Sequence, residues 1–562
     1  MQPLLEIQDL SIDFESENGV IHAVSNLSLE VNRGEIVALV GESGSGKSVT
    51  SLSILRLLPS PPAQYPTGKI LFREKDAAID LLRTSGKTLQ SIRGHKIAMI
   101  FQEPMTSLNP VMTCGKQVTE ALLAHEKLTK PAAKAKAIEW FAKVKLPFPE
   151  KMFDRYPHQL SGGQKQRVMI AMAMCCEPSL LICDEPTTAL DVTVQKTILE
   201  LIKELQREEQ LGVIFITHDL GVVAEIADRV AILYKGNLLE QGTTKEIFTN
   251  PSHPYTKALI ACRPALHPKG EKLPVVSDFM DGKTATHTIR EHVYTKLQNE
   301  PFIRVEQLSV KFPTKTNLLG KPLSYFTAVD DVSLHINKGE TVGLVGESGC
   351  GKTTLGRTLL RLIEPTSGNI FYSETNITTF DKKRLKSLRQ QVQLVFQDPY
   401  SSLNPRLTIG AAIAEPLQVF GIESSKKAQQ KKVAQLLDQV GLPSAMARRY
   451  PHEFSGGQRQ LIVIARALAL NPSLLVCDES VSALDVSVQA QVLNLLNDLK
   501  KELALTMLFI SHDLSVVRYM SDRIMVMQAG KIVETGDAEE VYRNPQSDYT
   551  RQLLDAIPKL AV

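Results

Sequence analysis

The sequence predicts an α/β fold that occurs twice, as two similar domains in tandem. Short motifs are repeated along the chain: SGGQ begins at Ser161 and again at Ser455, and HDL begins at His218 and again at His512. The same number of residues separates the two members of each pair, as a duplicated domain requires. Within each copy, short apolar runs alternate with amphipathic helical patterns, which is the order of elements in an α/β sheet.

The individual elements follow from the spacing of apolar residues. Residues 36–40, 180–183 and 213–217 are short apolar runs that end at turn or helix signals, and they predict buried parallel strands. Residues 197–209 place apolar side chains three and four positions apart, which predicts an amphipathic helix between two of these strands. The same pattern recurs in the second copy, so each copy is predicted to form one α/β domain.

The domain boundaries follow from the repeat and from a change in composition. The first copy spans residues 1–262 and the second spans residues 301–562. Residues 263–300 between them contain Pro264, Pro268 and Pro274 among mixed polar residues. Such a composition predicts a linker.

Composition excludes several classes of protein. The 562 residues are 43% hydrophobic and 22% charged, with a formal net charge of +3, which is typical of a globular protein and lacks the basic excess of a dedicated nucleic-acid binder. The apolar run at residues 461–470 is too short to cross a bilayer, and no signal peptide is read at the N-terminus. The seven cysteines form no CxxC pair, so we expect buried, reduced thiols.

Each copy carries a glycine-rich motif directly after an apolar run. The motifs GESGSGKS and GESGCGKT both fit the pattern GxxxxGK[ST] between a strand and a helix. Such a loop surrounds phosphates with backbone N–H donors, its lysine neutralises phosphate charge, and its last hydroxyl can bind magnesium. One match could be an accidental glycine turn, but two matches with their downstream partners predict two nucleotide sites. The predicted loop residues are Gly41, Glu42, Ser43, Gly44, Ser45, Gly46, Lys47 and Ser48 in the first copy, and Gly346, Glu347, Ser348, Gly349, Cys350, Gly351, Lys352 and Thr353 in the second.

Two adjacent carboxylates end an apolar strand in each copy. They are Asp184 and Glu185 in the first copy and Asp478 and Glu479 in the second. The carboxyl edge of an open parallel sheet is where ligands bind, so the apolar strand before each pair favours a catalytic role over a solvated strand end. We expect each aspartate to hold magnesium and each glutamate to orient and deprotonate an attacking water.

Two further polar residues in each copy follow apolar strands. His218 and His512 can hydrogen-bond a γ-phosphate and position the water. Gln102 and Gln397 can join the magnesium shell while their loops contact a partner, although a glutamine alone is a weak signal. The predicted magnesium ligands are therefore Ser48, Gln102 and Asp184 in the first copy, and Thr353, Gln397 and Asp478 in the second.

The runs LSGGQ at 160–164 and FSGGQ at 454–458 open helices with small residues, so their backbone N–H groups can face an anion. With these runs beside the phosphate loops, the chain resembles the ATP-binding-cassette superfamily over nearly its whole length outside the linker. The resemblance implies two tandem P-loop domains, each with a RecA-like α/β core, an antiparallel β subdomain and a helical signature subdomain. It also implies that the chain hydrolyses ATP with Mg²⁺.

In that superfamily, the signature of one domain faces the ATP held by the other, so two ATP molecules lie head to tail between the halves, which here pair within one chain. The resemblance assigns Ser161, Gly162, Gly163 and Gln164 to the nucleotide of the second copy, and Ser455, Gly456, Gly457 and Gln458 to that of the first. Residues 189–191 and 483–485 resemble the D-loops of the family. Two positions depart from the family pattern, Phe454 for leucine and Ser480 for the proline seen at Pro186, and neither removes a reacting group.

The segments NPSHPYTKAL at 250–259 and NPQSDYTRQL at 544–553 resemble the C-terminal segment of ATPases that serve dipeptide and oligopeptide importers. A plain reading of each segment is an exposed turn that opens a helix, but its place after a complete cassette favours kinship with importers. The resemblance implies two transmembrane permease subunits, an extracytoplasmic solute-binding protein, and a peripheral location on the cytoplasmic face of the inner membrane. Fused relatives serve peptide, microcin-like peptide and glutathione importers.

Three alternatives remain open from the residues. A tandem-cassette factor acting on ribosomes also lacks membrane spans, but such factors usually have a long charged helical connector, which the proline-containing linker does not resemble. A DNA-repair ATPase would need zinc-type cysteine pairs, which the seven cysteines do not form.

The adenine ring can stack on Phe14 or Phe312, although both are equally compatible with a core position. Many relatives carry a cysteine cluster for an iron–sulfur centre, and with Cys262 alone beside the first tail that property is not transferred.

Overall fold

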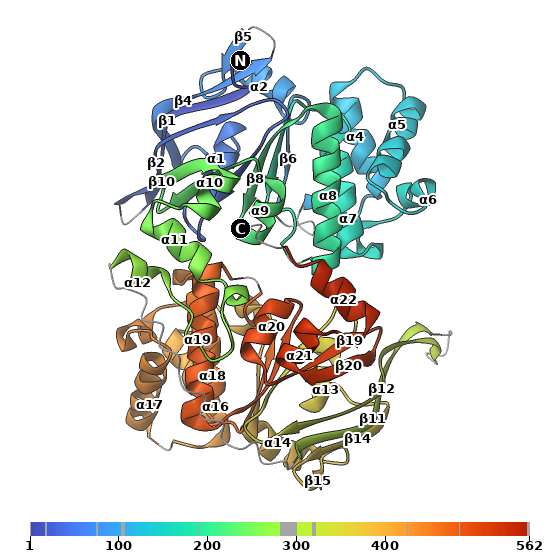
Figure 1. The fold of residues 1–562 in the computed structure, drawn as a ribbon, viewed down its shortest axis with the longest axis vertical. Helices are drawn as coiled ribbons and strands as arrows, with labels where there is room; N and C mark the ends of the chain where they lie inside the picture. Colours follow the sequence, from blue (N-terminus) through green and yellow to red (C-terminus); the bar gives the residue numbers. More distant parts are fainter. Residues whose placement is uncertain are drawn as a thin grey trace. The chain divides into compact units, whose positions relative to one another are not determined.

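The computed structural model describes residues 2–16, 19–74, 77–102, 107–188, 190–281, 301–316, 322–423, 425–482 and 484–558. They form two compact units, one made mainly of the chain up to Ile260 and the other of Ala261–Ile557. Both units are α/β, and each contains one antiparallel and one mostly parallel sheet (Figure 1).

The first unit has a four-stranded sheet of order β2-β1-β4-β5 and a six-stranded sheet of order β10-β9-β3-β8-β7-β6. Its strands are β1 (Leu5–Ser16), β2 (Gly19–Val31), β3 (Ile36–Val40), β4 (Ala63–Glu74), β5 (Ala77–Asp80), β6 (Ile97–Ile100), β7 (Leu180–Asp184), β8 (Gly212–Thr217), β9 (Arg229–Tyr234) and β10 (Asn237–Thr243). Its helices are α1 (Lys47–Ile54), α2 (Gly86–Ile92), α4 (Cys114–His125), α5 (Lys130–Lys143), α6 (Pro149–Phe153), α7 (Gly162–Met174), α8 (Val192–Glu209), α9 (Leu220–Ile226), α10 (Thr244–Thr249) and α11 (Pro254–Ala261), with a 3-10 turn at Pro157–Gln159.

The strands β3, β7 and β8 lie at the centre of the parallel sheet because both of their faces are covered. Every residue of these three strands is buried, as expected for continuous apolar runs in a parallel sheet. Helix α8 covers part of this sheet with its apolar face, and its first turn is capped by Asp191, which accepts a hydrogen bond from the N–H of Val194. The strands predicted from the apolar runs are therefore confirmed.

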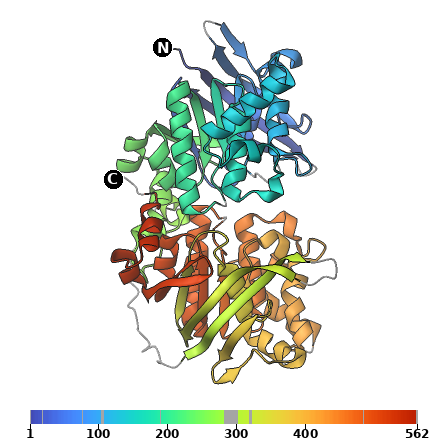
Figure 2. The ribbon, with the colours of Figure 1, turned by 90° about the vertical axis from the view of Figure 1, so that its right-hand side faces the viewer.

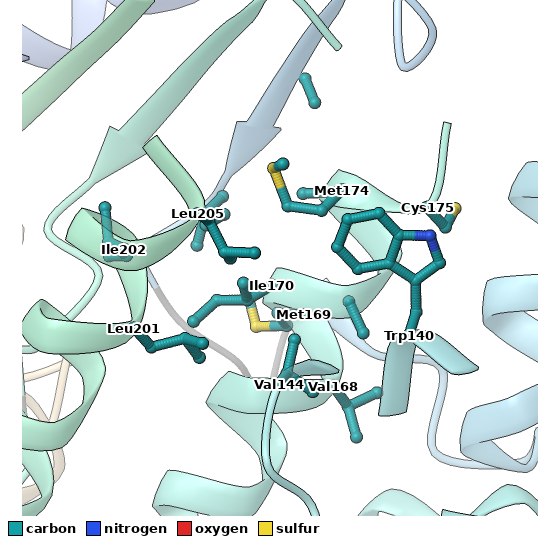
Figure 3. Close-up of a cluster of buried hydrophobic side chains, with 14 of the residues drawn as sticks. Trp140, Val144, Val168, Met169, Ile170, Met174, Cys175, Leu201, Ile202 and Leu205 are labelled. Atoms are coloured by element: carbon teal, nitrogen blue, oxygen red, sulfur yellow. The ribbon is translucent and has the colours of Figure 1, made fainter. Parts of the chain in front are cut away.

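The helical part of the first unit is built around one buried tryptophan. Helices α4, α5 and α6 gather beside α7 and α8 (Figure 1). Trp140 of α5 lies among the apolar side chains of α7, such as Met169 and Met174, while α8 contributes Leu201 and Leu205 to the same core (Figure 3). Helix α7 begins with the SGGQ residues, so this core holds the signature helix against the sheet-covering helix α8.

The second unit repeats this architecture, with a sheet of order β12-β11-β14-β15 and another of order β16-β17-β18-β13-β19-β20. Its long strands β11 and β12 pair antiparallel (yellow-green in Figure 2). The strands are β11 (Pro301–Thr316), β12 (Pro322–Asn337), β13 (Thr341–Val345), β14 (Ser367–Tyr372), β15 (Thr375–Asn376), β16 (Val392–Val395), β17 (Leu474–Asp478), β18 (Thr506–Ser511), β19 (Arg523–Gln528) and β20 (Lys531–Asp537). The helices are α12 (Val276–Met280), α13 (Lys352–Leu359), α14 (Lys382–Gln391), α15 (Pro399–Ser402), α16 (Ile409–Phe420), α17 (Lys426–Gln439), α18 (Gly456–Leu468), α19 (Val486–Leu503), α20 (Leu514–Met520), α21 (Ala538–Arg543) and α22 (Asp548–Asp555), with 3-10 turns at Pro264–Leu266, Ser444–Arg448 and Pro451–Glu453.

All seven cysteines are buried and none is in a disulfide. Burial raises the pKa of the Cys114 thiol to about 11, so this side chain stays protonated and behaves as a small apolar group. Among the residues that the structure describes, no helix has the length and apolar character that a membrane crossing requires.

The segment after the first cassette packs on the second unit over residues 261–281, whereas residues 282–300 lie outside the described part of the chain. Leu273 is fully buried, and its backbone N–H and C=O both bond to the side-chain amide of Asn494, at 2.9 and 2.8 Å. Nearby, the hydroxyl of Tyr519 donates to the carbonyl of Glu271 at 2.6 Å, and Lys269 forms an ion pair with Asp522. The boundaries 263–300 for a linker stay a prediction, and the described half of that segment is part of the second unit's fold.

We expect Asn494→Ala to destabilise the second unit, because the substitution leaves a buried N–H and a buried C=O of Leu273 without partners. Each such group costs about 1–3 kcal/mol. Denaturant unfolding of the full chain measures this loss, and limited proteolysis should show new cleavage within residues 261–281. The matched control is Gln491→Ala, an exposed position on the same helix. Equal stability of the two variants would show that the segment does not depend on this contact.

Candidate functional site

The order of the parallel strands brings the separate motifs of each copy together. In the first unit β3, β8, β7 and β6 are consecutive neighbours and run parallel. The phosphate loop follows β3, His218 follows β8, the carboxylate pair ends β7 and Gln102 follows β6. The carboxyl ends of parallel strands meet at one edge, so these side chains form one site at the place where open α/β sheets bind ligands.

The glycines of the first phosphate loop are required by close approach and by backbone conformation. A Cβ on Gly41 would lie 2.2 Å from the carbonyl oxygen of Leu233 on β9. Gly46 has a φ of +101°, and a Cβ there would lie 2.7 Å from the carbonyl oxygen of Ala23. The loop therefore lies directly on the neighbouring backbone, with no room for a side chain at either position.

The lysine of each loop is buried and bonded to the loop itself. Lys47 donates from Nζ to the carbonyl oxygens of Gly41 and Glu42, at 2.7 and 2.8 Å. Lys352 makes the same two contacts in the second unit, at 2.7 and 2.9 Å to Gly346 and Glu347. An ammonium group held inside a loop of backbone donors is placed to neutralise the charge of a bound phosphate chain.

A hydroxyl and a carboxylate meet at the start of the helix that follows each loop. Ser48 donates to Asp184 at 3.1 Å, and Thr353 donates to Asp478 at 2.9 Å. Burial raises the pKa of Asp184 to about 6 although the Ser48 hydroxyl lowers it, and burial likewise raises the pKa of Asp478. The second carboxylate oxygen of Asp478 is buried and receives no hydrogen bond from the described residues, although Nε of Arg357 lies 4.0 Å from it.

These oxygen donors fit a hard divalent cation. A carboxylate and a hydroxyl are ligands that Mg²⁺ accepts, and a buried carboxylate oxygen without a hydrogen bond gains most from a cation. The charge of such a cation would also favour the ionised form of both aspartates, against the effect of burial.

Each glutamate predicted to be catalytic lies beside several polar side chains. Glu185 accepts hydrogen bonds from Gln102 at 2.9 Å and Thr188 at 3.0 Å, and lies 3.3 Å from Nδ1 of His218. Burial disfavours the ionised form, but the hydrogen bond and charge of His218 outweigh it and lower the pKa of Glu185 to about 2. Although burial alone would lower the pKa of His218, the carboxylate of Glu185 raises it.

The second unit repeats this arrangement with small differences. Glu479 accepts a hydrogen bond from Gln397 at 2.7 Å and lies 3.6 Å from Nδ1 of His512 and 3.9 Å from Nζ of Lys352. Burial disfavours ionisation here too, yet His512 lowers the pKa of Glu479. Both glutamates have a φ of +47°, a left-handed conformation that non-glycine residues rarely adopt.

The signature residues form a closed cap on the first turn of their helix. Ser161 accepts a hydrogen bond from the N–H of Gln164 at 3.3 Å, and Gln164 accepts one from the N–H of Ser161 at 3.1 Å. The equivalent pair, Ser455 and Gln458, bonds in the same way. The side chain of each glutamine therefore caps its own helix, while its predicted contact with a nucleotide stays a prediction.

The two signature glycines have different surroundings. A Cβ on Gly163 would lie 2.5 Å from Val194 of α8, and a Cβ on Gly457 would lie 2.1 Å from Val488 of α19. These glycines let the signature helix pack closely on the next helix. A Cβ on Gly456 would meet no atom of the described residues within 4 Å, so there is open space beside this glycine.

The departures from the family pattern are accommodated in the fold. Phe454 is as well buried as Leu160, its counterpart in the first unit, and Ser480 is buried as well. Sequence reasoning missed Thr188, whose hydroxyl bonds to Glu185 and which has a hydroxyl counterpart, Ser482, at the same place in the repeat. Comparison of the two copies could have found it. The predicted D-loops begin at Ala189 and Ala483, which lie outside the described residues.

Comparison with known proteins agrees with this geometry. The family model described as "ABC transporter" matches residues 24–188 and 329–482, and that described as "Oligopeptide/dipeptide transporter, C-terminal region" matches residues 239–283 and 533–562. The chain is 48% identical over 564 residues to the glutathione import ATP-binding protein GsiA of Pectobacterium atrosepticum, covering 99% of this chain and 89% of that protein. It is 49% identical over 561 residues to the protein of the same name from Escherichia coli K12, with the same coverage.

Solved structures similar to parts of the chain include the post-hydrolysis dimer of the ATP-binding cassette MJ0796 bound to ADP and Pi. It is 27% identical, covers 42% of this chain and 98% of that chain, and has a TM-score of 0.38. Another is cbiO1 from Clostridium perfringens, part of the ABC transporter complex cbiONQ, at 25% identity, 44% and 92% coverage, and a TM-score of 0.38.

We expect Glu185→Gln and Glu479→Gln to leave ATP binding intact while turnover at the altered site falls about 100- to 10,000-fold, because a glutamine cannot accept a proton from water. Steady-state hydrolysis by each single variant and by the double variant, together with equilibrium nucleotide binding, measures this. Glu208→Gln, an exposed glutamate on α8, is the control. If one single variant lost all turnover while the other lost none, the two sites would not be equally competent.

We expect Asp184→Asn to stabilise the unliganded protein at pH 8. The folded pKa of about 6 lies above the usual 3.8, so the fold loses stability as pH rises between these values, by about 3 kcal/mol in all. Thermal unfolding at pH 8 and pH 5 measures the gain, which should fall to about half at pH 5.

ATP with magnesium should stabilise the parent protein more than ATP alone does. The Asp184→Asn variant should lose this difference, because its metal ligand is gone. Asp154→Asn, at an exposed position of the first unit, is the matched control. An Asp184→Asn protein that is less stable than the parent at pH 8 would contradict the raised pKa.

Proposed function

The chain belongs to the ATP-binding-cassette transporter family and hydrolyses ATP to power transport, and from this premise we propose that it energises the import of glutathione or short peptides. The observation that carries the proposal is the identity of 48–49% to glutathione import ATP-binding proteins over 99% of this chain. The match of both tails to the oligopeptide/dipeptide transporter region supports the same class of solute. A role on ribosomes receives no support from these similarities.

The partners follow from the family. An ATPase of this kind works with membrane permease subunits, and we propose that this chain serves two of them together with an extracytoplasmic solute-binding protein. We place the chain at the cytoplasmic face of the inner membrane, as a peripheral subunit. We expect no nucleic acid among its partners, and the near balance of 64 basic and 61 acidic residues fits this expectation.

The roles of the site residues follow from their positions. The loop around Lys47 binds the phosphates of ATP, and Ser48 with Asp184 would hold Mg²⁺, which would neutralise phosphate charge. Glu185 takes the proton of the attacking water, while His218 orients the glutamate and faces the γ-phosphate. The low pKa of Glu185 keeps it ionised and ready to accept a hydrogen bond from that water.

The hydrogen bond from Gln102 to Glu185 supports a further element of this proposal. The amide ties the loop after β6 to the catalytic carboxylate. Gln397 does the same with Glu479 in the second unit. A displacement of either loop by a permease would therefore change the position of the base, which couples transport to hydrolysis. The predicted role of these glutamines as magnesium ligands is compatible with this bond, because each amide donates to the glutamate through Nε2 and would bind the cation through Oε1.

Two aromatic side chains, Phe14 and Phe312, are candidates for stacking on the adenine ring of ATP. Phe14 is half-buried and packs against the apolar core of the first unit, whereas Phe312 is 38% exposed. The exposed ring of Phe312 has a face to offer to a base, and the packed ring of Phe14 has less. We therefore favour Phe312 for stacking in the second unit and a core role for Phe14.

We further propose that the signature of each half completes the nucleotide site of the other. The open space beside Gly456 and the exposed Ser161 support this, because a helix N-terminus that its own half leaves uncovered can bind an anion. Two sites result, one served by Lys47 and Ser455 and the other by Lys352 and Ser161.

Double variants distinguish this pairing from sites formed within one half. We expect Lys47→Ala with Ser455→Arg to damage one site and spare the other, whereas Lys47→Ala with Ser161→Arg should damage both. Nucleotide trapped with magnesium and a phosphate mimic is counted in each variant, with the single variants as controls. Trapping in the Lys47/Ser161 variant and none in the Lys47/Ser455 variant would show pairing within each half.

The import function is tested by uptake in cells that lack the chain but keep its permease subunits. We expect radiolabelled glutathione or a dipeptide to accumulate when the parent chain is restored, and not with the Glu185→Gln, Glu479→Gln double variant. Cofractionation with membranes rather than ribosomes should accompany uptake. Absence of uptake for both solutes, or sedimentation with ribosomes, would overturn the proposal.

A further inference from the structure

A tyrosine from the C-terminal segment of the first cassette reaches the phosphate loop. The hydroxyl of Tyr255 accepts a hydrogen bond from the backbone N–H of Glu42 at 3.1 Å. The carbonyl of Gly41, at the other end of the same peptide group, accepts the hydrogen bond from Lys47 at 2.7 Å. One peptide group of the loop is thus held on one side by the phosphate-binding lysine and on the other by the tyrosine.

The second cassette repeats this arrangement with different neighbouring residues. The hydroxyl of Tyr549 accepts from the N–H of Glu347 at 3.0 Å, and the carbonyl of Gly346 accepts from Lys352 at 2.7 Å. The tail sequences around the two tyrosines differ, HPYTKAL in one and SDYTRQL in the other. Because the contact recurs while its surroundings change, it is a feature of the site and not an accident of packing.

Each tyrosine is itself held in place. Tyr255 is fully buried, and its ring centroid lies 4.4 Å from that of Tyr234 on β9. The turn before helix α11 is fixed by Glu240 of β10, whose carboxylate accepts hydrogen bonds from the N–H groups of Ser252 and His253 at 2.7 and 3.1 Å.

The second tail is held by an equivalent carboxylate. Glu534 of β20 accepts hydrogen bonds from the N–H groups of Gln546 and Ser547 at 2.8 and 3.0 Å. Tyr549 is 7% exposed and stands in the first turn of α22. In both halves, therefore, a glutamate on the last strand fixes the tail and the tail fixes the tyrosine.

We propose that Tyr255 and Tyr549 are positioning residues for ATP, which set the shape of the phosphate loop through one peptide group. A bound phosphate competes with the carbonyl of Gly41 or Gly346 for the N–H donors of the lysine, and a glycine offers little resistance to rotation of its peptide. The tyrosine hydroxyl then keeps the peptide in the orientation that binds nucleotide. Through this contact, the C-terminal segment of each cassette becomes a structural part of the ATP site.

The expected consequence is a loss of nucleotide affinity and not of chemistry. A hydrogen bond of this kind contributes about 1 kcal/mol, which corresponds to about a fivefold change in an equilibrium constant. Tyr255→Phe with Tyr549→Phe should therefore raise the KM for ATP about fivefold, while kcat changes less than about twofold. Each single variant should weaken ATP binding at its own site alone.

The test uses the full chain with phenylalanine at either or both positions, so that the ring packing is kept. Tyr519→Phe is the matched control, since it also removes a buried tyrosine hydroxyl bond, but one whose acceptor is the carbonyl of Glu271, outside the phosphate loop. Equilibrium ATP binding, KM and kcat are measured for all variants. Amide hydrogen exchange of Glu42 and Glu347 gives a direct reading, and exchange at these amides should rise in the tail variants and not in the control.

A KM shift no larger than that of Tyr519→Phe, or unchanged exchange at both loop amides, would overturn the proposal. A loss of stability with unchanged affinity for ATP would likewise assign the tyrosines to the fold alone. Neither outcome would touch the import function, which is read from uptake.

Discussion

The order of the parallel strands, β3-β8-β7-β6 in the first half and β13-β18-β17-β16 in the second, is the constraint on which each half of this protein depends. A phosphate loop, a histidine, a carboxylate pair and a glutamine lie far apart in the sequence and carry no chemistry until their strands end at one edge. The register brings this about, for example by pairing Asp184 with Ile216 beside it on β8. A slip of β7 by one residue would move the carboxylate of Asp184 away from this edge, so the register fixes its place beside β8.

Burial at this edge gives the two carboxylates of each half opposite properties. Asp184 has a raised pKa because little compensates its loss of water, whereas Glu185 has a lowered one because His218 lies beside it. The first group gains from a cation and the second remains an acceptor for water. Adjacent residues at one strand end can therefore serve different roles.

Much of the fold and most of the site could be predicted from the sequence. Continuous apolar runs indicated the buried strands, and the repeat supplied every motif twice. The residues that sequence reasoning missed act through contacts between elements. Thr188 looks like an ordinary turn residue until it bonds to Glu185. Tyr255 belongs to a segment that reads as an exposed turn, yet it is fully buried against the phosphate loop. Residues 263–281 read as a linker, yet Leu273 is buried against Asn494.

The sequence by itself determined the duplicated α/β cassettes and the chemical groups at each site, because apolar periodicity and short motifs are local properties of a chain. Only the tertiary structure decided which donors hold Glu185, why Gly163 must lack a side chain, and where the tail tyrosines point. Those features depend on distances between residues remote in sequence, such as Glu347 and Tyr549, and on the loss of water around them. Neither these distances nor the loss of water can be predicted from the local sequence, because both arise only when the elements pack.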